Sequence, residues 1–386
     1  MMKQRLELPL GLLISQSGSY KAVSCAIRAG AQLALDEINA CPEQSVTLKP
    51  VAIDPAGSLA GYVEGARVLL RDHELKHVVG CYTSSSRKEV LPLFEKADAL
   101  LWYPSHYEGF ETSENIVYSG AGPNQHIVPL TRHLLRRFGN RGWMVGSNYI
   151  WAWENNRILR EAIAASGGAV MGERYFAVGE TDLGDVVSQI IRDRPDFVFT
   201  TLIGQSGIAF LKMLRAAAEA AGIDQPRDMP AASCSLSEVE LPQLGDAAAG
   251  HLSSSVYFST IASVENRRFV ALWNSRFGQI GQASADAEAA YVAVHLLARA
   301  AERAGSTEFE AVREAVRDLT FDAPQGRVTV DGENLHCWMR PRMGRSRKDG
   351  SFDIVMEHPE ALRPDPYLTW TLDARDSDSP DLRLIQ

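Results

Sequence analysis

Short apolar segments alternate with longer segments of helical spacing along most of the chain. Residues 8–15 predict a first strand, and residues 22–38 predict a helix because alanine, leucine and isoleucine recur there at helical spacing. Further strands are expected at residues 46–53 and 78–82, with a helix over residues 60–71 between them. This order of strands and helices is typical of a parallel sheet covered by helices.

The same alternation starts again near residue 126 and then gives way to a different tail. The second block predicts helices at residues 126–138, 154–165 and 183–192, and strands at residues 143–147, 169–176, 196–202 and 251–258. Helices at residues 267–277 and 286–303, a β-hairpin of residues 327–330 and 335–340, and a strand at residues 352–356 follow.

Two such blocks predict an α/β protein with two doubly wound lobes and a ligand cleft between them. We assign residues 1–120 and 251–322 to an N-terminal lobe, residues 121–250 and 323–372 to a C-terminal lobe, and residues 373–386 to a frayed tail. Because ligands bind at the carboxyl ends of parallel strands, we expect the loops at these ends to face the cleft.

The segment of residues 80–110 concentrates hydroxyl and aromatic side chains at two such strand ends. A run of hydroxyls, Thr83 to Ser86, follows the strand at residues 78–82, and the capping-box spacing of Ser86 and Glu89 predicts a helix from Ser86 to about Ala97. Hydroxyls beside a helix N-terminus suit a small neutral polar ligand. Aromatic residues at or just past strand ends indicate a pocket wall; they are Tyr82, Tyr103, Tyr107, Tyr149 and Trp151.

The charge and the apolar segments of the sequence bear on whether the protein binds nucleic acid, is secreted or spans a membrane. The net charge of −9 and the absence of a basic block argue against nonspecific nucleic-acid binding. The apolar run at residues 6–14 contains Glu7 and Pro9 and is interpreted as a first strand rather than a signal peptide. No segment has the apolar length needed to span a bilayer. A cytoplasmic location is expected, or a periplasmic one if a leader has been removed.

Motifs for catalysis or metal binding are not supported by their contexts. The HExxH pattern at residues 73–77 falls where a predicted helix gives way to a strand, and the SxxK pattern at Ser85 and Lys88 lacks its companion motifs. The five cysteines contain no CxxC pair. The sequence therefore predicts a protein that is not an enzyme, with no catalytic residue, metal or cofactor.

Three segments resemble the bacterial amide receptors that control the expression of aliphatic amidases. They are GCYTSSSRKEVLPLFEKADALLWYPSHYEGFE, NIVYSGAGPNQHIVPL and VGSNYIWAWENNRIL, and the tail segments DAPQGRV and RPDPYL fit the same family. Close relatives of these receptors are urea and short-chain amide binding proteins of ABC transporters. The resemblance covers nearly the whole chain and implies the type I periplasmic-binding-protein fold, in agreement with the two predicted lobes.

The resemblance also implies a site. Ser84 and Tyr149 would hydrogen-bond an amide, Ser105 would hold its other end, and aromatic rings would surround its alkyl part. This chain departs from the family pattern at Ser105 (usually threonine), His106 (usually proline) and Trp151 (usually tyrosine). Trp151 suggests an apolar wall, and His106 a donor that titrates near neutral pH. With the adjacent Ser85, the candidate ligand-binding residues are Tyr82, Ser84, Ser85, Tyr103, Ser105, His106, Tyr149 and Trp151.

The leading functional interpretation is a cytoplasmic sensor of short aliphatic amides that regulates amidase expression by sequestering or releasing an RNA-binding antiterminator. By this interpretation the chain contacts neither nucleic acid nor membrane directly, and a homo-oligomer is left open. The alternative is the solute-binding protein of an ABC importer for urea, short-chain amides or branched-chain amino acids. A DNA-binding repressor of the same fold needs an N-terminal helix-turn-helix module, for which the early first strand leaves no room.

Overall fold

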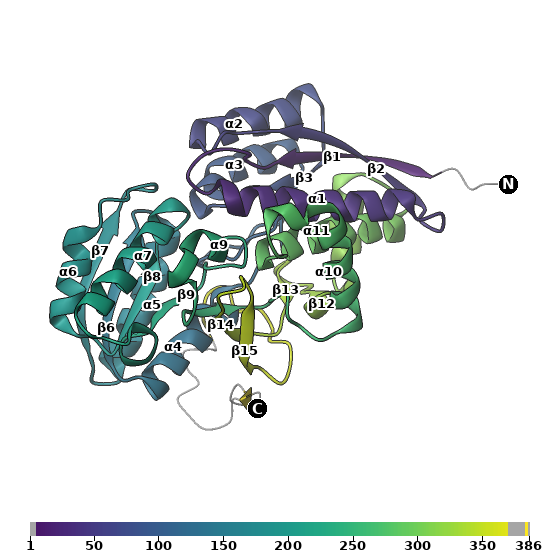
Figure 1. The fold of residues 1–386 in the computed structure, drawn as a ribbon. Coiled ribbons are helices and arrows are strands. Elements are labelled where there is room, and N and C mark those ends of the chain that lie inside the picture. Colours follow the sequence, from purple (N-terminus) through teal and green to yellow (C-terminus); the bar gives the residue numbers. More distant parts are fainter. Residues whose placement is uncertain (1–4, 370–382, 385–386) are drawn as a thin grey trace.

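The first lobe is built on a five-stranded parallel sheet, in a computed structural model that describes residues 5–369 and 383–384 (Figure 1). The strand order is β2-β1-β3-β4-β5. The strands are β1 (Leu6–Leu13), β2 (Val46–Ile53), β3 (His77–Gly80), β4 (Leu100–Tyr103) and β5 (Ile116–Tyr118). Helices α1 (Lys21–Ala40), α2 (Leu59–Arg67) and α3 (Ser84–Ala97) connect them, and α2 continues as a π-helical turn at Val68–Asp72.

The second lobe contains an eight-stranded sheet of order β16-β15-β14-β10-β9-β8-β6-β7. Its parallel part is β6 (Arg141–Ser147), β7 (Ala169–Phe176), β8 (Phe197–Thr201), β9 (Ala231–Ser233) and β10 (Leu252–Ser255). Antiparallel strands β14 (Arg342–Ser346), β15 (Phe352–Glu357) and β16 (Arg383–Leu384) extend it. Its helices are α4 (Ile127–Arg137), α5 (Ile150–Ala165), α6 (Gly184–Asp193), α7 (Gln205–Ala220), α8 (Gln225–Asp228) and α9 (Leu241–Leu244), with 3₁₀ turns at Pro123–Gln125 and Gly245–Ala248.

After β10 the chain returns to the first lobe. It forms α10 (Val264–Phe277), α11 (Ala285–Ala304) and α12 (Phe309–Val316), with a 3₁₀ turn at Gly278–Ile280, and α11 packs along α1 (Figure 1). The two helices approach so closely at Gly30 that a Cβ there would lie 1.9 Å from the carbonyl oxygen of Ala287. A small antiparallel sheet of β11 (Thr320–Ala323), β12 (Gly326–Val330) and β13 (Cys337–Trp338) follows.

The predicted α/β fold with two lobes is confirmed, and β12 and β13 form the predicted hairpin. The boundary near residue 250 is wrong, because β10 pairs with β9 and β14 in the second lobe and the crossing to the first lobe follows it. β12 and β13 also lie in the small sheet rather than in the sheet of the C-terminal lobe. Which sheet a strand joins depends on distant pairing that a local pattern does not contain. Of the predicted tail at residues 373–386, only residues 383–384 belong to the described part.

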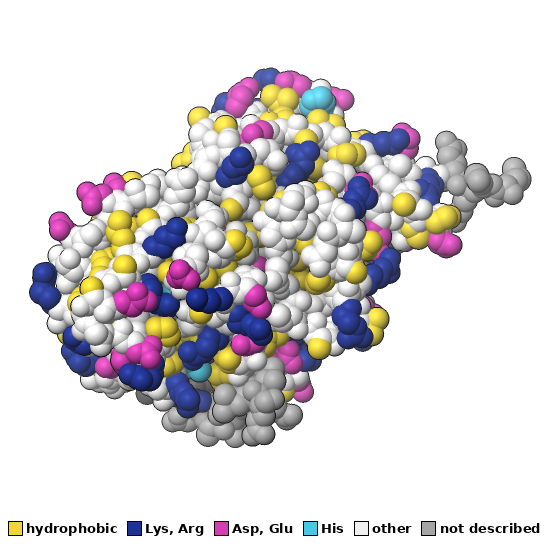
Figure 2. Space-filling view, in the orientation of Figure 1, with side chains coloured by type: hydrophobic (Ala, Val, Ile, Leu, Met, Phe, Trp, Pro, Cys, Tyr) yellow, Lys and Arg dark blue, Asp and Glu magenta, His cyan; other side chains and the backbone are white. Residues whose placement is uncertain are grey.

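Two surface properties bear on function. On the face drawn in Figure 2, lysine and arginine side chains are interspersed with acidic ones rather than gathered in one block. Among the helices that the structure describes, none combines the length and the apolar character required to cross a membrane.

Candidate functional site

A small pocket lies between the two lobes, where strand-end loops meet. Six of the eight predicted site residues line it together with Ile203, and they are Tyr82, Ser84, Ser105, His106, Tyr149 and Trp151. The first four follow β3 or β4 of the first lobe, and the last two lie at the start of α5 in the second. The volume open to a water-sized molecule is about 10 Å³, roughly enough for one water. The lobes are therefore closed over the pocket.

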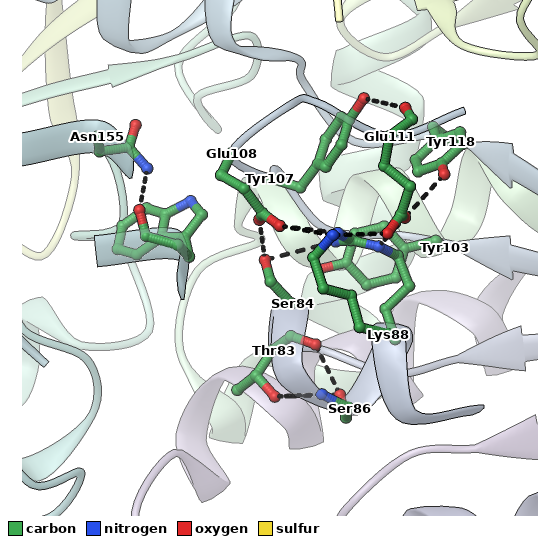
Figure 3. Close-up of polar contacts among 12 residues, drawn as sticks. Thr83, Ser84, Ser86, Lys88, Tyr103, Tyr107, Glu108, Glu111, Tyr118 and Asn155 are labelled. Carbon is green, nitrogen blue, oxygen red and sulfur yellow. Dashed lines mark hydrogen bonds and ion pairs between the residues drawn. The ribbon is translucent and has the colours of Figure 1, made fainter. Parts of the chain in front are cut away.

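Ser84 is placed by the start of α3. Thr83 is the N-cap, and its hydroxyl oxygen accepts a hydrogen bond from the Ser86 N–H at 3.2 Å. The helix thus begins before the predicted start at Ser86, because the first hydroxyl of the run, rather than the fourth, satisfies a free N–H of the first turn. Figure 3 shows Ser84 at this helix end pointing at Glu108, to which its hydroxyl donates a hydrogen bond.

A buried ion-pair network supports Ser84 from behind. Arg87 Nη2 lies 3.0 Å from Glu108 Oε1, and Arg87 Nε lies 2.6 Å from Glu111 Oε1, while Lys88 reaches Glu111 at 2.8 Å (Figure 3). The side chains of Arg87 and Glu108 are at most 1% exposed. Burial opposes ionisation of Glu111, but Arg87 more than offsets it and lowers the pKa of Glu111 to about 2. Arg87 is therefore neutralised by protein carboxylates and is not free to pair with an anionic ligand.

Asp286, which the sequence analysis did not select, places a carboxyl group behind Ser105 from the start of α11. Its Oδ1 accepts a hydrogen bond from Ser105 Oγ at 3.3 Å and lies 3.9 Å from His106 Nδ1. Asp286 is only 4% exposed, and burial raises the pKa of Asp286 to about 7. Burial and the nearby His126 lower the pKa of His106 to about 3. The prediction that His106 titrates near neutral pH is therefore wrong, because the imidazole is buried and stays neutral.

Two further buried carboxyl groups lie close to this cleft. Burial raises the pKa of Glu238 to about 7 and that of Glu240 to about 8, and the charge of Asp286 acts in the same direction on both. Glu240 lines a second cavity, of about 380 Å³, between the loop that begins at Gly18 and the start of α7 at Gln205. At neutral pH both carboxyl groups are therefore partly or mostly protonated, and each can then donate as well as accept a hydrogen bond.

Two predicted residues do not line the pocket. Tyr103 is fully buried behind it, where its hydroxyl donates to the carbonyl oxygen of Tyr82 at 2.8 Å and its ring lies 4.8 Å from the Arg87 guanidinium. Ser85 follows Ser84 in the helix, so its side chain points about 100° further around the axis, and it is half-buried outside the pocket. Tyr103 thus positions the pocket wall rather than forming it.

Aromatic rings form much of the remaining wall. Tyr149, the N-cap of α5, stacks on Trp151 with ring centroids 6.2 Å apart, and His106 meets the Trp151 ring edge-on at 5.2 Å. From the first lobe, Tyr20 packs on Tyr82 at 5.2 Å. These contacts join rings of both lobes around one small space.

The sequence analysis missed Arg87, Lys88 and Asp286, and only the first two could have been found from the sequence. Arg87 and Lys88 lie three and four positions after Ser84, a spacing that places them on the same helix face. That spacing could have indicated a charged network behind the serine. Asp286 had no such signal, since its partner Ser105 is 181 residues away in the sequence. Within the described residues, no cluster of three or more His, Cys, Asp or Glu side chains is arranged to hold a metal ion.

Comparisons with known proteins agree on the architecture. The family described as "Periplasmic binding protein domain" matches residues 8–372. A curated protein named limonene hydroxylase, from Geobacillus stearothermophilus, is 31% identical over 125 residues, which are 32% of this chain and 23% of that protein. Leu/Ile/Val-binding protein homolog 6 of Brucella melitensis is 23% identical over 290 residues, covering 73% of this chain and 72% of that protein.

A solved structure shows the same fold over almost the whole chain. It is the solute-binding protein of an ABC transporter from Rhodopseudomonas palustris HaA2 in complex with p-hydroxybenzoic acid. It superposes with a TM-score of 0.82 at 21% identity and covers 95% of this chain and 100% of its own.

Proposed function

Because the chain belongs to the periplasmic binding protein family and has its type I two-lobed fold, we propose that it is a solute-binding protein for a small ligand rich in N–H donors, such as urea or a short-chain amide. The ligand would be held between the lobes at this pocket, and because the closed pocket has room for only about one water, the lobes must part to admit the ligand. The chain would then release it when the lobes open.

One observation carries this proposal: Ser84 and Ser105 offer acceptor lone pairs at the pocket, and no lysine or arginine is among the described residues that line it. Asp286 lies behind Ser105, and behind Ser84 Arg87 is already paired to Glu108 and Glu111. A carboxylate ligand would need a positive partner to offset its desolvation, whereas an amide or urea N–H group is matched by these oxygens. The ligand class differs in this respect from the p-hydroxybenzoic acid of the solved relative.

A second candidate is the regulatory form of the same binding function. In it the chain senses a short amide and controls amidase expression by sequestering or releasing an RNA-binding antiterminator. The segments that resemble the amide receptors supply Ser84, Ser105 and Tyr149 to this pocket, which favours this candidate. The mechanism requires that the amide bind one lobe arrangement more tightly than the other, since equal affinity would shift no equilibrium.

A thermal-shift screen of the ligand-stripped protein tests the proposal. The panel contains acetamide, propionamide, butyramide, urea, leucine, valine, glutamate and p-hydroxybenzoate. A ligand present at about a hundred times its dissociation constant should add about 2.7 kcal/mol to the free energy of unfolding. Stabilisation by amides or urea is expected. If amino acids alone stabilise the protein, the amide proposal is wrong and the ligand is an amino acid. Amino acids are also the ligand class in the name of the Brucella relative.

A gene deletion separates the two candidates. Loss of an importer's binding protein abolishes amide-dependent growth at low amide concentration and leaves amidase expression inducible at high concentration. Loss of the sensor instead makes amidase expression independent of the amide, because nothing then sequesters the antiterminator.

A further inference from the structure

Trp151 carries a buried hydrogen-bond donor that the protein does not use. The side chain lines the interlobe pocket, and the residue is 2% exposed. Its indole Nε1 is buried and has no acceptor among the residues that the structure describes. Tyr149 stacks on the ring and His106 meets it in a T-shaped contact, so the indole is held by neighbours from both lobes.

An unpaired buried indole N–H is unfavourable, and tryptophan usually finds a partner for this group. At a ligand pocket the missing acceptor is most simply an atom of the ligand, which restores the hydrogen bond when it binds. Trp151 is therefore not only the apolar wall that the sequence suggests, because its indole N–H can also donate a hydrogen bond.

The two serines on the first lobe act as hydrogen-bond acceptors, whereas Trp151 carries a donor. Ser84 donates its hydroxyl proton to Glu108, and Ser105 donates its proton to Asp286 at 3.3 Å. Because a hydroxyl has a single proton, both serines present only lone pairs to a ligand. Beside the hydroxyls of Tyr82 and Tyr149, the pocket thus has acceptor lone pairs at Ser84 and Ser105 on the first-lobe side and the unpaired indole donor of Trp151 on the second-lobe side.

We propose that Trp151 determines ligand specificity by donating a hydrogen bond from its indole N–H to the carbonyl oxygen of the bound ligand. The inference rests on the proposed amide-binding function and adds a requirement to it. The ligand must carry an acceptor on the side away from its N–H group, as a primary amide and urea do. An amidine has the same shape as the amide but no carbonyl oxygen, and at neutral pH it is a protonated cation whose nitrogens only donate, so it cannot accept this hydrogen bond.

Isothermal titration of acetamide and acetamidine into wild type, Trp151→Phe and Trp102→Phe tests the inference. Trp102 is a matched control, since it is also buried with an unpaired Nε1 but does not line the pocket. In Trp151→Phe the affinity for acetamide should fall about tenfold, the size of one hydrogen bond, while the affinity for acetamidine stays within about twofold. Trp102→Phe should leave both affinities within about twofold.

Each of the other outcomes contradicts one part of the proposal. Equal losses for both ligands in Trp151→Phe would assign the effect to ring packing, and no loss for acetamide would remove Trp151 as a donor. If wild type binds neither ligand, the amide-binding function fails and this inference fails with it.

A second readout is made on the wild-type protein. In the wild-type protein labelled with ¹⁵N at its indole nitrogens, one resonance, identified by its absence in Trp151→Phe, should move downfield when acetamide binds. The Trp102 indole resonance should stay in place. No movement of the Trp151 resonance at saturating acetamide would overturn the hydrogen bond directly.

Discussion

Ser105 and Asp286 are 181 residues apart in the sequence, yet the Ser105 hydroxyl donates a hydrogen bond to Oδ1 of Asp286 at 3.3 Å. Ser105 follows β4, and Asp286 lies in the first turn of α11, which the chain forms in the first lobe after it has left β10 of the second. Helix α11 therefore supplies the carboxyl group that lies behind Ser105. Its ionisation links the pocket to pH.

Amide binding should strengthen as the pH rises through about 7. Burial raises the pKa of Asp286 to about 7, so the carboxyl group is mostly protonated below that pH and ionised above it. The ionised form accepts the Ser105 hydroxyl proton more strongly, which leaves the Ser105 lone pairs for an N–H group of the ligand. Calorimetric titration of acetamide across this range should show the affinity rising with pH.

The control for this prediction is Asp286→Asn, which cannot ionise. Glu238 and Glu240 change charge in a similar range, so the difference between wild type and variant isolates the contribution of Asp286. Parallel pH profiles for the two proteins would show that Asp286 does not control binding.

Replacing Ser84 by alanine should weaken amide binding by about 1–3 kcal/mol, because a buried N–H of the ligand loses its acceptor. Ser85→Ala is the matched control, since Ser85 is the next residue of the same helix and lies outside the pocket. Its effect on binding should be within about 0.5 kcal/mol. Equal losses for the two variants in calorimetry would remove Ser84 from the site.

Glu108→Gln should destabilise the whole protein by about 3–5 kcal/mol, because it leaves Arg87 buried with one carboxylate fewer. It should also weaken amide binding, since Ser84 loses the carboxylate that fixes its hydroxyl. Urea unfolding measures the first effect. In the same assay Asp72→Asn, which breaks the exposed ion pair with Arg71, should not shift the midpoint measurably. A midpoint for Glu108→Gln equal to that of wild type would contradict the structural role of the buried pair.

Gly204→Ala should hold the lobes apart and weaken ligand binding. A Cβ at Gly204 would lie 2.3 Å from the carbonyl oxygen of Ser19, which belongs to the other lobe and accepts a hydrogen bond from the Gln205 N–H at 3.2 Å. Gly204 also has a φ of +58°. Calorimetry with acetamide should show a loss of affinity, and small-angle scattering of the liganded protein should show a larger radius of gyration.

The control is Gly222→Ala, beyond the other end of the same helix α7. Gly222 has a φ of +68° but no atom within 4 Å of a Cβ. Both substitutions should cost about 1 kcal/mol of stability through backbone strain. Only Gly204→Ala should reduce the affinity for the ligand, and an equal reduction in both would attribute it to strain rather than to lobe closure.

Local patterns predicted most of the helices and strands and most of the residues that line the pocket. Helical and strand periodicity depends only on residues that are close in the sequence. Tyr82, Ser84, Tyr149 and Trp151 follow strand ends, and parallel strands bring such ends together. The helix start was misplaced because four consecutive hydroxyls offer several caps, and only the fold selects Thr83.

The remaining errors have a different cause. The pKa of His106 depends on burial by residues that are distant in the sequence, and so does the partnership of Asp286 with Ser105. The sheet to which β10 belongs is decided by β14, about ninety residues later in the chain. No window of neighbouring residues contains such information.

The packing of α11 on α1 has a consequence for synthesis of the chain. A ribosome that has completed the five strands of the first lobe, at Tyr118, must add strands β6 to β10 of the second lobe before it reaches Ala285, where α11 begins. Until then the face of α1 that contains Ala26, Gly30 and Ala34 lacks its covering helix. The nascent first lobe therefore exposes this apolar face of α1 until the residues of α11 have been synthesised.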